Sequence, residues 1–191
     1  MRLINFNHFS GFEHSEDIFV DTGILLAFLN EYDPWYPTVS KLFNDHILNN
    51  PNEINLYTHA AVISEVAHLA EKPLDQYMRA FNFHFCDLDV VETAERVIEG
   101  LDRMIELDHL EILESNKGSM LHQIKYSRQL GSTDALIASV VQEYGISLLT
   151  VDSKLANRIK RIPTGFYNVN NVYFTNSIYM DYQIPRELEN T

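Results

Sequence analysis

The sequence contains little cysteine and lacks any long hydrophobic stretch. Cys86 is the only cysteine among 191 residues, which excludes an intrachain disulfide and a metal site built from several cysteines. The longest apolar windows, residues 23–29 and 135–141, are far shorter than the ~20 residues that a membrane-spanning helix needs. Residues 1–16 have no apolar stretch behind a basic start, so no signal peptide is expected. These absences predict a soluble protein of the cytoplasm.

Basic residues are also scarce. The chain has 14 Lys and Arg against 27 Asp and Glu, which gives a formal net charge of −13. Such a chain is a poor general binder of nucleic acid, because affinity for phosphate comes mainly from Lys and Arg. A local basic patch can still bind RNA. Lys154, Arg158, Lys160 and Arg161 form one candidate, which is either a phosphate-guiding patch or a solvated helix face.

The order of predicted elements indicates an α/β fold with a parallel β-sheet flanked by helices, and the length of 191 residues fits one domain. Short apolar runs predict strands, and apolar residues at helical spacing predict helices. Strands are predicted at 18–20, 54–57 and 146–151, with a further strand within 83–91. Helices are predicted at 22–29, after Pro34, at 60–71, from Glu92, at 132–144 and at 153–161. Ser132 or Thr133 is expected to cap the helix 132–144, and Gly145 to end it.

Two segments extend this pattern. The stretch 107–131 is expected to add an extra helix, and residues of about 162–191 form a C-terminal extension beyond a core of about 17–161. The extension is aromatic and β-prone between 166 and 182, and the sequence assigns it no role.

Four acidic residues border apolar elements. Asp21 follows the strand 18–20, Asp152 follows the strand 146–151, Glu65 lies beside the apolar stripe of its helix, and Asp134 opens the helix 132–144. Each alone has a simpler interpretation: the strand-end Asp residues cap the next helices, Glu65 turns to solvent, and Asp134 suits the helix dipole. Together they are more informative, because parallel strands bring their carboxyl ends to the sheet edge where ligands bind.

Four carboxylates that converge at one edge would repel one another unless a cation lay between them. Mg²⁺ and Mn²⁺ take oxygen ligands and commonly bind substrate phosphate as well. A pair of such ions stabilises both the attacking and the leaving oxygen of a phosphodiester. The acids therefore indicate phosphoryl-transfer chemistry. Crowding of like charges also predicts that at least one of these carboxyl groups has a raised pKa.

The four acids lie in four short motifs. These are the segment that begins Asp21-Thr22-Gly23-Ile24, then Ser64-Glu65-Val66, then Ser132-Thr133-Asp134-Ala135, and finally Leu149-Thr150-Val151-Asp152. In this order they resemble the motifs of PIN-domain nucleases, including VapC-type toxins. Each motif is weakly specific alone, and the set spans residues 18 to about 161, most of the chain.

This resemblance implies a single PIN-like domain and a divalent-metal-dependent endoribonuclease that hydrolyses phosphodiester bonds of single-stranded RNA. It further implies that Asp21, Glu65, Asp134 and Asp152 are the catalytic residues and the ligands of one or two Mg²⁺ or Mn²⁺ ions. Thr22 would orient Asp21 or a bound water, and Thr150 would support the same pocket. Independently of the resemblance, Lys154 and Arg158 of the basic patch that follows Asp152 are the residues expected to bind the substrate.

The resemblance also bears on partners. A toxin would bind an antitoxin, which is expected to place an Arg-bearing segment against the carboxylates. Toxin-like relatives commonly pair, so a homodimer is expected.

The sequence departs from the family pattern at two places. Tyr36 stands where many relatives have His, and the segment 101–131 is longer than in compact toxins.

Two other functions stay open at this point. A catalytically idle PIN-like module could bind RNA or a protein, although such a module has no need of four converging carboxylates. An aspartyl-phosphate phosphatase would typically carry Asp-x-Asp after the first strand, where this chain has Gly23 in the second acidic position. RNA cleavage with and without chelator separates the nuclease from the idle module, and phosphatase turnover tests the third possibility.

Overall fold

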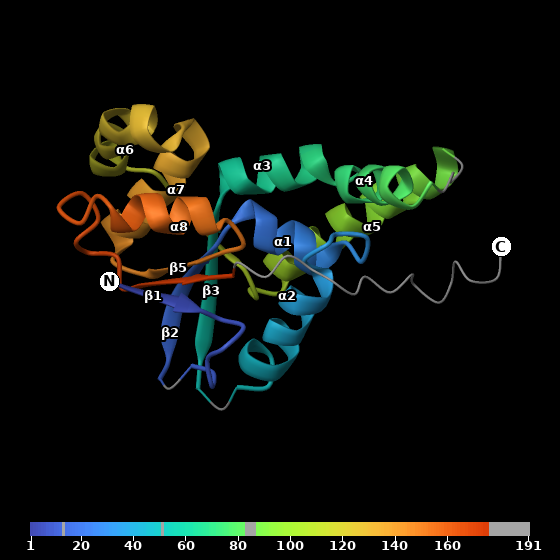
Figure 1. Ribbon diagram of the computed structural model, residues 1–191, viewed down its shortest axis with the longest axis horizontal. Coiled ribbons are helices and arrows are strands. Elements are labelled where there is room, and N and C mark those ends of the chain that lie inside the picture. The colour runs from blue at the N-terminus through green and yellow to red at the C-terminus, as the bar shows by residue number, and fades with distance from the viewer. Residues whose placement is uncertain (13, 51, 83–86, 176–191) are drawn as a thin grey trace.

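In the computed structural model, which describes residues 1–12, 14–50, 52–82 and 87–175, six strands form one sheet. All neighbouring strands are parallel, in the order β1-β6-β5-β2-β3-β4. Figure 1 shows β2 and β3 of this sheet side by side. The strands are β1 (Arg2–Asn5), β2 (Glu16–Val20), β3 (Ile54–His59), β4 (Glu111–Leu113), β5 (Ser147–Thr150) and β6 (Asn171–Phe174).

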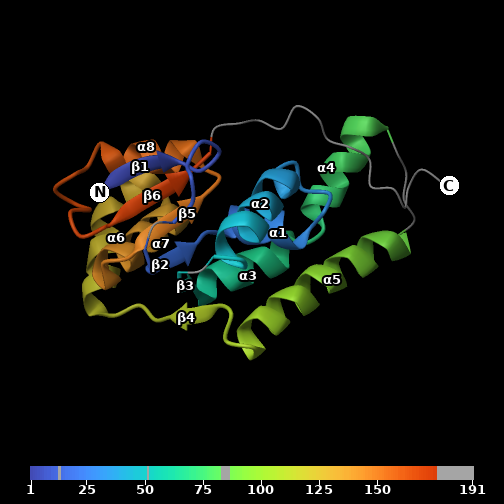
Figure 2. The same ribbon diagram turned by 90° about the horizontal axis from the view of Figure 1, so that it is seen from below.

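Helices cover both sides of this sheet. They are α1 (Thr22–Leu29), α2 (Tyr36–Leu42) with its π-helical continuation η1 (Phe43–Ile47), α3 (Ala60–Leu69), α4 (Lys72–Phe81), α5 (Asp87–Glu106), α6 (Lys117–Leu130), α7 (Ser132–Tyr144) and α8 (Ser153–Lys160). In Figure 2 the row of strands separates α6 and α7 from α1, α2 and α3. None of the described helices is both long and apolar enough to cross a membrane.

The two central strands form the middle of the core. Ile18, Phe19 and Val20 of β2 are fully buried, and every residue of β5 is buried. A strand covered by helices on both faces needs apolar side chains on both, which makes it a continuous hydrophobic run rather than an alternating one. This is why short apolar runs located these strands in the sequence. The predicted fold, a parallel sheet flanked by helices, is confirmed.

The strand predicted within 83–91 is wrong where the structure describes it. Residues 83–86 lie outside the described residues, and from Asp87 the chain is helical in α5, five residues before the predicted helix start at Glu92. The reason is the spacing of the buried side chains: Thr93, Val97 and Leu101 follow one another every four residues and share one helix face. The strand that follows β3 in the chain is instead β4, which comes after α5.

The start of α7 also differs from the prediction. Gly131, with φ of 105°, is the N-cap residue, and no side chain caps the helix. Because α6 ends at Leu130 and α7 begins at Ser132, a single residue must turn the chain. Glycine adopts this positive φ without steric cost. Ser132 is thus inside the helix, and its prediction as a cap, with Thr133 as the alternative, is wrong.

Both ends of the described chain add strands to the same side of the sheet. β6, which belongs to the C-terminal extension, pairs with β5 so that Phe174 lies opposite Thr150. β1 pairs with the outer edge of β6, and the Phe6 amide donates to the Phe174 carbonyl at 3.0 Å. The extension therefore contributes a strand beside β5, the strand that precedes Asp152.

Candidate active site

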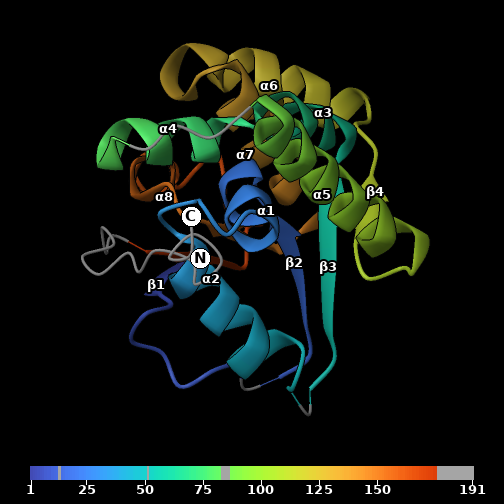
Figure 3. The same cartoon turned by 90° about the vertical axis from the view of Figure 1, so that its right-hand side faces the viewer.

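Asp21 lies at the carboxyl end of β2, where the chain turns directly into α1. Figure 3 shows β2 and β3 side by side, leading into α1 and α3 at the same end of the sheet. The Asp21 side chain caps α1, accepting the Thr22 amide at 2.7 Å on Oδ1, and its other oxygen, Oδ2, accepts the Thr150 hydroxyl at 2.6 Å. The carboxylate is only 8% exposed and has one donor on each oxygen, so its orientation is fixed by two neighbouring strand ends.

Glu65 reaches the same place from α3. The Thr22 hydroxyl donates to Glu65 Oε2 at 2.7 Å, which joins the first residue of α1 to the middle of α3. Glu65 is half-buried, while Val62 and Val66 on its helix are fully buried. The apolar face of α3 thus sets the helix against the core, and Glu65 at the border of that face lies toward Asp21 instead of open solvent.

Asp152 follows β5 and caps α8. Its Oδ1 accepts the amides of Lys154 at 2.7 Å and Leu155 at 3.0 Å. Its own amide donates to the Thr150 hydroxyl at 2.9 Å, so Thr150 connects Asp152 to Asp21. Thr150 is fully buried. The capping interpretation of Asp21 and Asp152 is therefore correct, and it holds together with their convergence at the sheet edge.

Asp134 lies in the first turn of α7, and its carboxylate contacts the guanidinium of Arg158. Arg158 Nη1 lies 3.6 Å from Asp134 Oδ2 and also donates to the Leu130 carbonyl at 3.0 Å. Arg158, expected from the sequence to bind substrate, thus contacts one of the four acids. Lys154, the other residue of that expectation, is exposed at the start of α8.

The four carboxylates interact electrostatically. Burial raises the pKa of Asp21 from 3.8 to about 6, against the opposing effect of the Thr150 and Thr22 hydrogen bonds, and the charges of Asp134 and Asp152 raise it further. Burial is also the main reason why the pKa of Asp134 is raised, followed by the charge of Asp152, while Arg158 lowers it and Glu65 raises it. A raised carboxyl pKa was expected from crowding, but the larger cause is loss of hydration.

The four carboxylates are not gathered closely enough in the described structure to hold one metal ion together. Among the residues that the structure describes, no three His, Cys, Asp or Glu side chains are grouped so as to hold a metal ion. Hydroxyl, amide and guanidinium groups contact Asp21, Asp152 and Asp134 individually. The chemistry of the set nevertheless fits a hard divalent ion, since its donors are carboxylate oxygens with an excess of negative charge.

Gly23 permits the close approach of α1 to β5. A β-carbon at this position would lie 2.6 Å from Val151 Cγ2, nearer than two carbon atoms can pack. The backbone that follows Asp21 can therefore lie against the residue that precedes Asp152. Sequence reasoning quoted this glycine as part of a motif but did not identify its steric role, which depends on a side chain 128 positions further along.

The comparison with protein families agrees with this geometry. The model of the PIN domain matches residues 18–161, which is 144 of the 191 residues and contains all four acids. The chain belongs to the PIN-domain family. The matched range runs from within β2 to the end of α8, so β1 and β6 lie outside it.

A solved structure shares the fold. The chain is similar to one in the structure of VapBC2 from Rickettsia felis bound to a DNA fragment from their promoter. The two superpose with a TM-score of 0.50 at 18% sequence identity, covering 84% of this chain and 99% of that one. At this identity the likeness concerns the PIN fold alone. A comparison with curated proteins finds no match.

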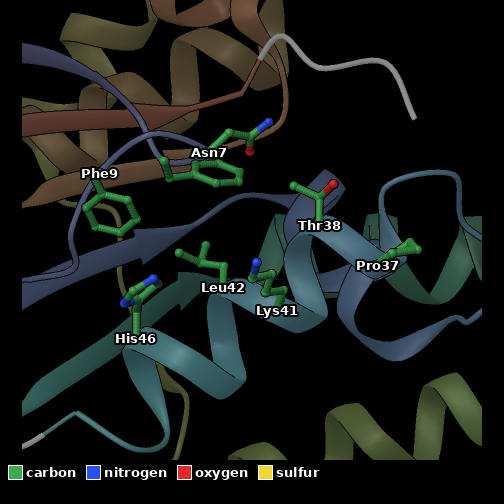
Figure 4. A pocket seen from close by; sticks show the side chains of 8 residues that line it. Asn7, Phe9, Pro37, Thr38, Lys41, Leu42 and His46 are labelled. Carbon is green, nitrogen blue, oxygen red and sulfur yellow. The ribbon is translucent and has the colours of Figure 1, made fainter. Parts of the chain in front are cut away.

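The structure also has a pocket apart from the acids. It has a volume of about 390 Å³ and lies between the N-terminal loop and the helices α2 and η1. Figure 4 shows Phe9, Thr38, Lys41 and His46 around it. None of the four acids lines this pocket, so it is not part of the candidate active site.

Proposed function

We propose that this PIN domain is a divalent-metal-dependent endoribonuclease that hydrolyses phosphodiester bonds of single-stranded RNA. Asp21, Glu65, Asp134 and Asp152 would hold one or two Mg²⁺ or Mn²⁺ ions and are the catalytic residues of this proposal. The observation that carries it is a continuous hydrogen-bonded chain, Glu65–Thr22–Asp21–Thr150–Asp152, at the carboxyl edge of the sheet. Asp134 interacts electrostatically with three members of the same set.

The protein's own groups have distinct roles in this mechanism. Thr150 and the Thr22 amide orient Asp21, because they bind one oxygen each and leave the remaining lone pairs for a ligand. Thr22 does the same for Glu65 through its hydroxyl. Such fixed carboxylates need little reorganisation when charge develops on the phosphate, which is the main source of electrostatic catalysis.

A bound divalent ion would supply Lewis-acid stabilisation of phosphate charge and lower the pKa of a bound water. The attacking water must also lose a proton to the protein. Asp134 and Asp152 are the two candidates for accepting it, because both are less buried than Asp21, which is 8% exposed. The exposed Lys154, beside Asp152 at the start of α8, would contact a substrate phosphate.

The first test is cleavage of a labelled single-stranded RNA in Mg²⁺ or Mn²⁺. Asp21→Asn is expected to lower the rate by orders of magnitude, since it removes a charge from the centre of the network. Asp17→Asn is the matched control: the same change on the same strand, at an exposed residue bonded to Asn55. Undiminished cleavage in excess chelator would show that the reaction needs no divalent metal. Equal losses of cleavage rate in Asp21→Asn and Asp17→Asn would show that Asp21 has no special role in the reaction.

The idle-module alternative has one observation in its favour, the contact of Arg158 with Asp134. An idle module would bind RNA with no metal-dependent turnover, so the same assay decides between the two.

By likeness to VapC-type toxins, the chain would act as the toxin of a toxin–antitoxin pair and form a homodimer. An antitoxin would place an Arg-bearing segment on the four carboxylates. Co-purification of a small partner, lost when Asp21 and Glu65 are both neutralised, is the expected sign of such a pair.

A further inference from the structure

Arg158 is fixed in place by two parts of the fold. Its Nη1 donates to the carbonyl of Leu130, the last residue of α6, and lies 3.6 Å from Asp134 Oδ2 at the start of α7. A cation is favoured at a helix C-terminus, where unpaired carbonyl groups carry partial negative charge. Arg158 therefore sits at the junction between α6 and α7 although it belongs to α8.

The contact places a positive charge inside an acidic site. Asp134 interacts unfavourably with the charges of Asp152, Glu65 and Asp21, and favourably with that of Arg158. A divalent ion bound through Asp134 Oδ2 would have to share that oxygen with the guanidinium or displace it, and an ion bound through Oδ1 would still bind a carboxylate whose charge Arg158 partly neutralises. It would also be repelled by that group across a few ångströms, where charge interactions are strong.

We propose that Arg158 is a built-in counter-ion of Asp134, and that it limits the site to a single divalent ion on the side of Asp21. The guanidinium supplies the positive charge that a second ion would otherwise bring to Asp134. This inference rests on the proposed function, because it takes the four carboxylates to be the metal site. It also assigns Arg158 a role other than that of a general RNA contact, which the exposed Lys154 can fill.

The test is a titration with Mn²⁺, in which free ion is measured by electron paramagnetic resonance. The wild-type chain is expected to bind one Mn²⁺. Arg158→Gln is expected to bind two, with the first on the order of tenfold tighter because a repelling charge is gone. Lys160→Gln is the matched control, since it removes the same charge from the exposed end of the same helix. Arg158→Lys, which keeps the charge, is expected to bind one ion.

A further variant identifies the second ion. Arg158→Gln combined with Asp134→Asn should return the count to one, because the added ion depends on Asp134. Two ions in the wild-type chain, or an Arg158→Gln titration that matches Lys160→Gln, would overturn the inference. A wild-type chain that binds no Mn²⁺ would instead contradict the proposed function itself, so the two failures are distinguishable. Circular dichroism of each variant establishes that it is folded.

Discussion

At the scale of single residues, the buried charge of Asp21 is unfavourable for folding. The carboxylate is 8% exposed at a junction of two strands, and its pKa of about 6 shows how poorly its charged form is solvated there. Residues held in such conditions are common at functional sites and costly elsewhere. Asn at this position would keep the cap on α1, because an amide oxygen can also accept the Thr22 amide.

This residue predicts a pH dependence of stability. The folded pKa of Asp21 lies above the unfolded value of 3.8, so the folded state binds more protons between these values. Protonated Asp21 therefore leaves the free energy of unfolding at its full value below about pH 4. That part of the stability is lost as Asp21 ionises while the pH rises through about 6. A shift of about two pKa units corresponds to about 3 kcal/mol. In chelator, Asp21→Asn should gain stability relative to wild type across this window.

The measurement is urea unfolding of both proteins at several pH values. The difference in unfolding free energy should increase from pH 4 to pH 6 and then level off. A difference that stays constant from pH 4 to pH 7 would mean that the Asp21 charge is not destabilising in the folded state.

At the scale of elements, sequence patterns predicted those parts whose signals are local. Asp21 and Asp152 each end a short apolar run and cap the next helix, so both strands and both caps were visible in the sequence. The edge strand β1 was not predicted, and the β-prone segment 166–182 was given no partner strand, because the pairing of β1 with β6 joins residues about 170 positions apart. The contact of Arg158 with Asp134 was missed for a similar reason, since it depends on how α8 packs against α6 and α7.

The packing of α6 against α7 gives a second prediction. The His122 ring contacts the Ser139 hydroxyl at 3.0 Å and the Gly165 carbonyl at 2.8 Å, which links two helices to the loop before β6. Burial is the main reason why its pKa is lowered. The unfolded state therefore binds more protons below about pH 6.5, and stability from this group is lost as the pH falls through that range.

His122→Phe would keep the ring contacts with Tyr126 and Phe166 but leave Ser139 and Gly165 without this partner. It should cost about 1–3 kcal/mol at pH 7.5. The cost should shrink at pH 5, where only the wild-type chain loses stability through His122. Unfolding free energies at the two pH values test this, and an equal cost at both would show that the His122 pKa is not lowered.

At the scale of the whole molecule, the outer face of α6 is unusually apolar. Met120, Leu121 and Ile124 are 55%, 58% and 72% exposed on this helix. Three large apolar side chains together on one helix face are typical of an interaction surface. This face gives the predicted homodimer a specific location.

The homodimer prediction is tested by analytical ultracentrifugation at micromolar concentration. The wild-type chain should sediment at twice its mass of 22.1 kDa. Ile124→Lys should sediment as the monomer, because a charge would be buried in the interface. Val91→Lys, at an exposed apolar residue of α5, should remain dimeric. A wild-type chain that stays at 22.1 kDa would rule out the dimer under these conditions.

The central claim is that the four acids act as one catalytic unit. A double-mutant cycle on the rate of RNA cleavage tests it most directly, with Asp21→Asn, Glu65→Gln and the two combined. Residues that act together show strongly non-additive losses, and Thr22 joins these two carboxylates by hydrogen bonds. The account predicts that the double variant is no slower than the slower single variant. Losses that multiply, or a Glu65→Gln variant as fast as wild type, would contradict it.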